Sequence, residues 1–282
     1  MKLARLGAPG REKPALVTDD AVFDLSDVIQ DLDPASIADG AIEKIRAALA
    51  TGSLREIVGA PGLRIGPPVA RPSAVLCIGL NYTAHAAESG AVPPSSPVLF
   101  LKTPNTLGGP DDRVDIPRGS TKTDWEVELG VVIGKRALYL DSPADAAEHI
   151  AGYLAADDLS ERTFQLEISG GQWSKGKSAP GFSPLGPWLV TPDEVDPANL
   201  RLRSWVNGEE RQNSSTADMI FPVDQIIWHL SQHLALEPGD IILTGTPEGV
   251  ALSGRFPYLS PGDVVEIEID GLGRQRHEFG QA

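Results

Sequence analysis

The fold is decided by one stretch of the sequence, Asp124-Trp125-Glu126-Val127-Glu128-Leu129-Gly130-Val131-Val132-Ile133-Gly134. Large apolar side chains occupy every second position of this stretch, from the tryptophan to the isoleucine. Such an alternation predicts a half-buried β-strand. Because successive side chains of a strand point to opposite faces, Asp124, Glu126 and Glu128 fall together on the face opposite the apolar row.

This acidic row has two interpretations. The ordinary one is a solvated strand face, since three carboxylates along one strand repel each other. The strand, however, continues directly into the apolar segment 131–133, which makes full exposure of this region unfavourable. Carboxylate oxygens at this spacing also suit a hard divalent cation such as Mg2+, Mn2+ or Ca2+. A metal site therefore stands as the alternative to a solvated face.

The chain has 282 residues, which is enough for one large domain or for one domain with a small appendage. Its 24 basic and 39 acidic residues give a formal net charge of -15 at pH 7. This charge argues against nucleic acid or an anionic membrane as a partner. An anionic substrate would have to be attracted locally, by a metal ion or by a few well-placed cationic side chains.

The single cysteine, Cys77, excludes an internal disulfide and is typical of a protein in a reducing compartment. It stands in the apolar run 74–78, so a small buried side chain is a better interpretation than a nucleophile. No signal-peptide core follows Met1, and no apolar run approaches the length of a membrane span. We therefore expect a cytoplasmic protein.

Turn residues divide the chain into two parts. We expect residues 1–70 to form a small N-terminal α+β domain, with strands at 2–6, 15–18 and 21–25 and one helix at 37–49. Prolines between 66 and 72 mark the boundary, and residues 71–282 form the main domain. The elements expected there are strands at 74–80, 98–102, 240–243 and 264–269, and helices at 81–90, 142–149 and 222–234.

The main domain contains many short strands and few helices. Asn207-Gly208, between two strand-like runs, is a strong signal for a β-hairpin. This pattern argues against a doubly wound sheet. It predicts an α+β, mostly β fold, in which a mixed β-roll or sandwich core carries helices on its outside.

Several motifs are candidates for a functional site, and each also has an ordinary structural interpretation. Residues 171–178 match the phosphate-loop pattern, but the prolines that follow exclude the helix that such a loop requires. His229 and His233 have the i, i+4 spacing of metal ligands, yet no acidic residue follows at a useful distance, so satisfied histidines on a helix flank are favoured. His149 and His277 are interpreted as surface polar residues.

His85 and Glu88 lie three residues apart in a short expected helix, and would share one face. A carboxylate beside an imidazole fixes its tautomer and raises its basicity, as a general base requires. An exposed ion pair is the equally simple alternative. Lys177 follows a glycine-rich loop from which an ammonium group can reach inward, although an ordinary surface lysine is the simpler interpretation.

Taken in order, these motifs resemble the fumarylacetoacetate hydrolase family. The resemblance covers residues 74–279 and is carried by Gly79-x-Asn81-Tyr82-x-x-His85-x-x-Glu88, Asp124-Trp125-Glu126-x-Glu128-Leu129, Asp158-Leu159-Ser160-Glu161-Arg162, Gly176-Lys177-Ser178 and Gly245-Thr246-Pro247-x-Gly249. Within the family, the chain is most similar to the 2,4-diketo-3-deoxy sugar acid hydrolases and to members known as 2-hydroxyhepta-2,4-diene-1,7-dioate isomerases. The resemblance implies that residues 71–282 form a catalytic domain with a mixed β-roll core, and that the protein is a homodimer.

The resemblance also implies roles for individual residues. Glu126, Glu128 and Asp158 would bind the metal, with Mg2+ as the expected ion and Mn2+ or Ca2+ as alternatives. His85 and Glu88 would activate water, and Lys177 would lie beside the metal as a catalytic cation. The positions implied for contact with a small keto-acid substrate are Arg162, Gln165 and Thr246.

The implied reaction is metal-dependent hydrolysis of a carbon–carbon bond in a 2,4-diketo acid of the acylpyruvate or diketo-deoxy sugar acid type, which releases pyruvate and a carboxylic acid. Two alternatives remain. One is an isomerase, tautomerase or oxaloacetate-type decarboxylase that uses the metal and the same enolate, and the other is a keto-acid binding protein with little turnover. The chain also departs from the family pattern, since Pro180 and Gly181 stand where close relatives carry Asp and Thr. Two polar groups near Lys177 are thereby lost, which leaves the exact substrate open.

Overall fold

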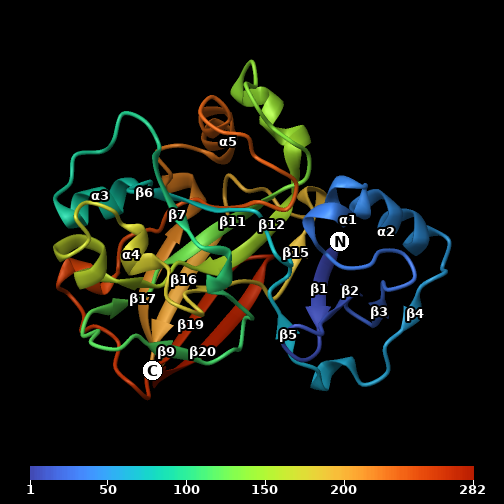
Figure 1. Ribbon diagram of the computed structural model, residues 1–282, viewed down its shortest axis with the longest axis horizontal. Helices are drawn as coiled ribbons and strands as arrows, with labels where there is room; N and C mark the ends of the chain where they lie inside the picture. The colour runs from blue at the N-terminus through green and yellow to red at the C-terminus, as the bar shows by residue number, and fades with distance from the viewer.

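The computed structural model describes residues 1–282 and contains two open β-sheets that share a core (Figure 1). The larger sheet has eleven strands, in the order β4-β3-β2-β1-β15-β12-β11-β18-β6-β7, with β5 beside β1. Its strands in the main part of the chain are β6 (Val75–Gly79), β7 (Val98–Lys102), β11 (Val127–Ile133), β12 (Ile150–Asp157), β15 (Leu189–Val190) and β18 (Ile241–Leu243). The sheet is mixed, because β18 pairs parallel with β6 but antiparallel with β11.

Strand β11 lies in the middle of this sheet, between β12 and β18. The expected alternation is confirmed: Val127, Leu129, Val131 and Ile133 point into the core shared with the second sheet. All seven residues of β11 are buried, so the prediction of a half-buried strand is wrong. The reason is that a second core, which contains Val132, covers the opposite face as well.

The acidic stretch is also interrupted. Trp125 and Glu126 separate β11 from the short strand β10 (Thr123–Asp124), which pairs with β13 (Ser160–Glu161) rather than with the larger sheet. The break lies next to the end of β12, where the chain turns toward β13. This local irregularity is what brings the first part of the acidic row close to the residues that follow β12.

The second sheet has the order β17-β16-β19-β20-β9. Its strands are β9 (Val114–Ile116), β16 (Arg201–Val206), β17 (Glu209–Ser215), β19 (Val264–Ile269) and β20 (Gly273–Gln281). The predicted hairpin joins β16 to β17, and its two turn residues have the left-handed φ angles, 52° for Asn207 and 80° for Gly208, that a two-residue turn needs. Leu202, Ile267 and Phe279 of this sheet lie in the shared core. The expected mostly β, α+β fold is confirmed.

The N-terminal part of the chain continues the larger sheet (right side of Figure 1). Its strands are β1 (Lys2–Leu6), β2 (Lys13–Val17), β3 (Val22–Asp24), β4 (Arg55–Glu56) and β5 (Ile65–Gly66), and β1 pairs antiparallel with β15. The division into domains at 1–70 and 71–282 stays a prediction. The single helix expected at 37–49 is wrong: α1 (Pro34–Ala38) and α2 (Ala41–Ala50) are separate, because Gly40 between them has a left-handed φ of 74°.

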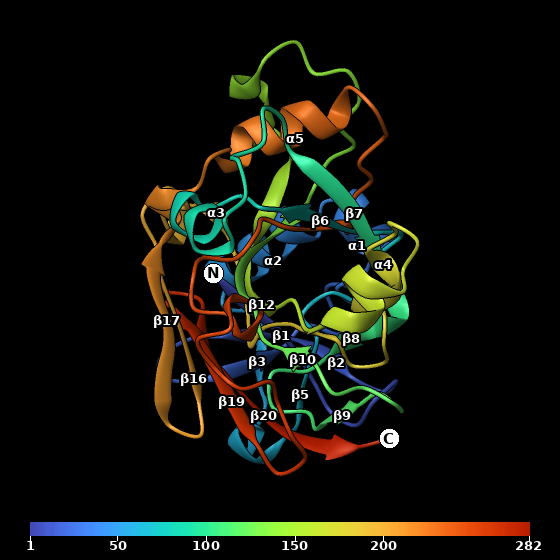
Figure 2. The same cartoon turned by 90° about the vertical axis from the view of Figure 1, so that its left-hand side faces the viewer.

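The helices of the main part are short. They are α3 (Thr83–Ser89), α4 (Ser174–Lys177) and α5 (Val223–Ser231), with a π-helical turn η4 (Thr163–Glu167). The helix expected at 142–149 is the 3-10 helix η3 (Pro143–His149), which begins with a capping box between Ser142 and Asp145 and packs beside α5. In Figure 2, α3 and α4 lie on either side of β12.

The remaining elements are the paired strands β8 (Leu107–Gly108) and β14 (Ser183–Pro184), and the 3-10 turns η1 (Ala60–Gly62), η2 (Pro104–Thr106), η5 (Pro192–Glu194), η6 (Thr216–Asp218) and η7 (Ala251–Ser253). No helix of the chain combines the length and the apolar character that crossing a membrane would require. Cys77 is fully buried in β6, as its apolar surroundings predict.

Candidate active site

Three acidic side chains converge where β11 begins and β12 ends. Glu126 and Glu128 are two residues apart on one face, and Asp158 directly follows β12. The antiparallel ladder continues past the two strands, since the amide of Asp158 donates to the carbonyl of Glu126 at 2.9 Å. One carboxylate oxygen of each residue lies within 4.8 Å of the other two, and all three residues are buried. The structure therefore brings the predicted metal ligands together, and a solvated strand face is excluded.

Two buried lysines partly neutralise this acidic cluster. Lys177 Nζ donates to Glu126 Oε2 at 2.6 Å and to Asp158 Oδ2 at 2.7 Å. Lys102, the last residue of β7, donates to Asp158 Oδ1 at 2.5 Å and to the carbonyl of Phe182 at 2.6 Å. Burial disfavours a charged lysine, but the carboxylates of Asp158 and Glu126 outweigh it and raise the pKa of Lys177. Lys177 is thus a permanent buried cation, and the simpler interpretation of a surface lysine is wrong.

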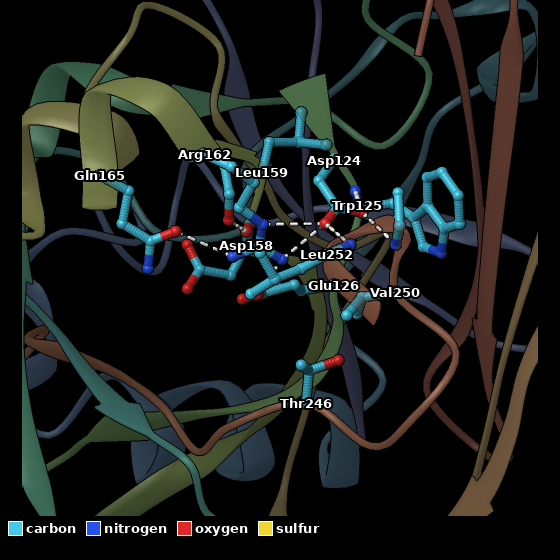
Figure 3. Close-up of polar contacts among 12 residues, drawn as sticks. Asp124, Trp125, Glu126, Asp158, Leu159, Arg162, Gln165, Thr246, Val250 and Leu252 are labelled. Carbon is cyan, nitrogen blue, oxygen red and sulfur yellow. Dashed lines mark hydrogen bonds and ion pairs between the residues drawn. The ribbon is translucent and has the colours of Figure 1, made fainter. Parts of the chain in front are cut away.

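Arg162 connects the acidic stretch to η4 (Figure 3). Its Nη2 donates to Glu126 Oε1 at 2.7 Å, its Nε to Asp124 Oδ2 at 2.8 Å and its Nη1 to Gln165 Oε1 at 2.9 Å. Asp124 also accepts from the amides of Ala251 and Leu252, so it holds Arg162 and does not join the cluster. Burial raises the pKa of Glu126, but the cations Lys177 and Arg162 outweigh it and lower that pKa to about 2.

Glu128 is the least neutralised of the three carboxylates. Its Oε2 accepts from the amide of Gly245 at 2.8 Å, and its side chain forms no other hydrogen bond. Burial, followed by the charges of Asp158 and Glu126, raises the pKa of Glu128 well above its usual value. A divalent cation among the three carboxylates would relieve this repulsion, and carboxylate oxygens are the ligands that Mg2+, Mn2+ and Ca2+ prefer. The donor set therefore fits a hard divalent ion.

The neighbouring Asp157 plays a different part from Asp158. Its Oδ1 accepts from the amide of Glu126 at 2.9 Å, whereas its Oδ2 is buried without a partner. Burial raises the pKa of Asp157 to about 7. Asp157 thus fixes the backbone at the break before β11, while Asp158 points into the cluster, as the motif resemblance implies.

His85 and Glu88 share one side of α3, but no hydrogen bond joins them. Nδ1 of His85 lies 3.9 Å from Glu88 Oε2 and has no hydrogen-bond partner. Glu88 instead accepts from the amide of Gly249 at 3.0 Å and from Arg255 at 2.9 Å. Burial lowers the pKa of His85 and outweighs the opposite effects of Glu126 and Glu88. The net shift is opposite to the predicted rise in basicity, and it favours the neutral form of this buried imidazole.

Thr246 lies across from Asp158 and Gln165 in the same site (Figure 3). Its hydroxyl donates to the carbonyl of Val127 at 3.0 Å and accepts from Gln212 Nε2 at 2.8 Å. The preceding Gly245 has a left-handed φ of 99°, and its amide donates a hydrogen bond to Glu128. This turn therefore closes over the start of β11.

The three clustered carboxylates, Lys177, Arg162, Gln165, His85 and Thr246 border one cavity of about 190 Å³. Of the predicted site residues, only Glu88 is absent from its lining, and neither Pro180 nor Gly181 reaches it. The departure from the family pattern at Pro180 and Gly181 therefore lies outside the cavity. A larger hollow of about 580 Å³ beside η3 and α5 contains no lysine, arginine or histidine and a single acid, Asp224. We place the candidate site in the smaller cavity because the ionisable groups converge there.

Sequence reasoning missed Lys102. It has the same parity along β7 as the buried Phe100, so a period of two could have placed it on the inner face. The prediction that two other histidines lie at the surface is wrong, since His149 and His277 are buried. The ring of His229 on α5 lies 4.9 Å from the ring of His233, and neither lines the cavity. α5 ends at Ser231, so His233 lies beyond the helix that was expected to continue to residue 234.

Comparison with known proteins supports the motif resemblance. The family model described as fumarylacetoacetate (FAA) hydrolase C-terminal matches residues 74–279. A Burkholderia multivorans protein whose name is no more specific than hydrolase is 47% identical over 280 residues, which cover 98% of this chain and 97% of that protein.

Two solved structures extend the comparison to the fold. Maleylpyruvate hydrolase from Sphingobium sp. SYK-6, in complex with manganese (II) ion and pyruvate, has a TM-score of 0.82 and 30% identity, and the match covers 100% of both chains. The 5-carboxymethyl-2-hydroxymuconate delta-isomerase from Mycobacterium smegmatis has a TM-score of 0.79 and 32% identity, with 100% of this chain and 99% of that chain covered. The structural neighbours thus include both hydrolases and isomerases. The chain belongs to the fumarylacetoacetate hydrolase family.

Proposed function

We propose that the protein is a metal-dependent hydrolase that cleaves a carbon–carbon bond in a 2,4-diketo acid and releases pyruvate and a carboxylic acid. One observation carries this proposal. The three clustered carboxylates face the same cavity as His85, whose buried Nδ1 has no partner. The cluster suits a divalent ion, and a neutral imidazole suits a base, which together are the requirements for hydrolysis of a chelating substrate.

A divalent ion (Mg2+, or else Mn2+ or Ca2+) would be held by Glu126, Glu128 and Asp158 and would supply a Lewis acid for the carboxylate and 2-oxo oxygens of the substrate. Lys177, already fixed beside two of these carboxylates, would add a permanent positive charge where negative charge develops. Nε2 of Gln165 forms no hydrogen bond within the protein and lies in the cavity wall, where it can donate to the substrate. These local groups offset the repulsion that a net charge of -15 exerts on an anionic substrate.

The chain's own base completes the reaction. His85 would accept a proton from water, and the water oxygen would form a bond to C4 of the substrate. The bond between C3 and C4 then breaks, its electron pair remains on C3 as the enolate of pyruvate, and a proton converts that enolate to pyruvate. The acyl part leaves as a carboxylic acid. In this scheme Lys177 stays protonated throughout, which fits the raised pKa of this group.

A second candidate function keeps the ion and the enolate but omits the attack of water. It is an isomerase, a tautomerase or an oxaloacetate-type decarboxylase. The observation in its favour is the distance of 3.9 Å between His85 and Glu88, which leaves the proposed base without the carboxylate that would orient it. The relatives include an isomerase as well as a hydrolase, so the comparisons support either chemistry.

A substrate panel distinguishes these functions. Acylpyruvates, diketo-deoxy sugar acids and oxaloacetate would be supplied separately with Mg2+ or Mn2+, and pyruvate and the released acid would be quantified. We expect equal amounts of pyruvate and acid from a 2,4-diketo acid. Pyruvate from oxaloacetate alone would contradict the hydrolase proposal, and tight keto-acid binding without any product would indicate a binding protein.

Two variants test the assignment of roles. Glu126→Ala should abolish metal binding and activity together, because it removes one ligand and the partner of Lys177. His85→Ala should leave metal affinity, measured by calorimetry, within about twofold, while hydrolysis falls by about 100-fold or more, as is typical for loss of a general base. Full hydrolysis by His85→Ala would show that another group activates water.

A further inference from the structure

The cavity has no lysine or arginine that is free of a carboxylate, and its third basic group, the imidazole of His85, is taken by its role as the proposed base. Its basic lining residues are Arg162, Lys177 and His85. Lys177 already donates to two carboxylates and, at 3.4 Å, to the carbonyl of Asp158. Arg162 forms ion pairs with Asp124 and Glu126. The remaining capacity of these cations is required for the keto-acid end of the substrate, so a second carboxylate at the other end would find no charged partner.

The cations that are nearest in sequence to lining residues do not themselves line the cavity. Lys175, which stands between Trp173 and Lys177, has an exposed side chain and is absent from the lining. Arg255 is the nearest by sequence to the lining residue Leu252, and it is paired with Glu88 and lies over the ring of Phe256, 5.2 Å from the ring centroid. Two neutral polar groups of the lining are also engaged, since Ser89 donates to the carbonyl of Ala86, and Thr246 is held between Val127 and Gln212. The free donor Nε2 of Gln165 is already assigned to the keto-acid end of the substrate. A chain with several hydroxyl groups would therefore meet few partners.

The rest of the lining is apolar and partly aromatic. Phe100 and Trp173 meet edge to face with their ring centroids 5.6 Å apart, and Lys177 Nζ lies 5.1 Å from the centroid of Phe100. Trp173 rests directly on the backbone of Gly79, where an added Cβ would lie 2.4 Å from the tryptophan ring. This contact fixes the aromatic wall beside the reacting groups. The other apolar side chains of the lining are Ile78, Leu80, Ala91, Leu166 and Leu252.

We propose that the acyl group beyond C4 of the substrate is a short, uncharged aliphatic chain, bound against the wall formed by Phe100 and Trp173. The inference rests on the proposed function and narrows its substrate class. Burying an unpaired carboxylate is far more costly than burying a methyl group, because the lost hydration is not replaced. The cavity therefore selects simple acylpyruvates and rejects diketo acids that carry a second carboxylate or several hydroxyl groups.

A matched pair of substrates tests this selection. 2,4-Dioxoheptanoate and 2,4-dioxoheptanedioate differ only in a terminal methyl or carboxylate. We expect kcat/KM with Mg2+ or Mn2+ to favour the methyl compound by at least about 100-fold. Binding is measured separately with 2-oxoheptanoate and 2-oxoheptanedioate, which lack the 4-oxo group and cannot be cleaved. Calorimetry should show that the monoacid binds more tightly than the diacid, in agreement with the preference in cleavage.

A cation added to the cavity lining should reduce the preference for the uncharged acyl chain. Leu166 lines the cavity and is 45% exposed, so Leu166→Arg can keep its stem at the surface. We expect the preference for the methyl compound to fall by about tenfold or more. Ile168→Arg adds the same charge two residues away at a 64% exposed position that does not line the cavity, and should leave the ratio unchanged.

The results distinguish the inference about the acyl group from the hydrolase proposal. Equal or better cleavage of the dicarboxylate by the natural protein overturns the inference but leaves the hydrolase proposal standing. If neither diketo acid yields pyruvate, the proposed function fails, and the binding of the two 2-oxo acids alone decides the preference. If neither 2-oxo acid binds, or the diacid binds more tightly, the inference fails too.

Discussion

At the scale of single residues, Lys102 is the clearest test of how the acidic cluster is balanced. It is buried, and it donates to Asp158 and to the carbonyl of Phe182. Lys102→Met removes the charge, so Asp158 keeps Lys177 as its only cationic partner. Breaking a buried ion pair in this way should lower the free energy of unfolding of the metal-free protein by about 3 kcal/mol. Urea unfolding followed by circular dichroism measures this change.

The matched control is Lys135→Met, which removes an exposed pair with Glu148. Its loss of stability should be much smaller, because water and salt screen an exposed ion pair. Mg2+ or Mn2+ should return part of the stability of the Lys102 variant, because the ion provides a new partner for Asp158. A Lys102→Met protein that unfolds like the surface control would show that Lys102 does not neutralise the cluster.

His85 yields a prediction for pH dependence. Burial lowers its pKa below the usual 6.5, and a general base acts only in its neutral form. Lowering the pH from 8 to 6.5 should therefore protonate less than half of His85, and the acidic limb of kcat/KM should have its midpoint below 6.5. Titration of the His85 ring by NMR gives the same pKa directly. A midpoint at or above 6.5 would mean that Glu126 and Glu88 outweigh burial.

At the scale of elements, the turn after β18 connects the backbone to the site. Gly245 has a left-handed φ, its amide donates to Glu128, and an added Cβ would lie 2.7 Å from Cβ of Asn81. Gly245→Ala should therefore lower the free energy of unfolding by about 3 kcal/mol, through backbone strain and overpacking together. Gly254→Ala is the control, since Gly254 has a φ of +78° but open space around it, and should cost about 1 kcal/mol. Similar losses in thermal and urea unfolding of the two variants would contradict the role of the close contact.

Local sequence patterns predict these elements well where one short segment contains the whole signal. The hairpin at Asn207-Gly208 and the strand at 264–269 are of this kind. Local patterns fail where a second layer of the fold determines burial, or where a partner distant in sequence determines the position of a side chain. The alternation of apolar residues along β11 does not show that its other face is buried as well. The helical spacing of apolar residues from 37 to 49 likewise does not show that the helix is broken at Gly40, between α1 and α2. In the site, the motifs place the three carboxylates, but the partner of Lys102 lies 56 residues away and no local signal shows it.

At the scale of the whole molecule, net charge and site charge act together. The chain carries -15, and its most crowded carboxylates meet in one buried cluster. The cations of the cluster, Lys102, Lys177 and Arg162, are all engaged by carboxylates, yet Glu128 keeps a raised pKa. Glu128 therefore has no cationic side chain as a direct partner, and a bound divalent ion would supply the positive charge that it lacks. The homodimer implied by the family resemblance stays a prediction.

Removal of the charge on Glu128 should separate the stability of the chain from its affinity for an ion. Because burial and neighbouring carboxylates disfavour the ionised form, Glu128→Gln should leave the metal-free protein as stable as the natural one, or more stable. In the natural protein, Mg2+ or Mn2+ at about 100 times its Kd should raise the free energy of unfolding by about 2.7 kcal/mol. The Gln variant should lose most of this gain. The measurement is urea unfolding with and without the ion at about 0.15 M salt, which screens diffuse attraction to the acidic surface. Glu148→Gln, at an exposed site, should keep the full gain. If Glu128→Gln is stabilised as much as the natural protein, the ion does not bind at the cluster, and its effect comes from the general negative charge.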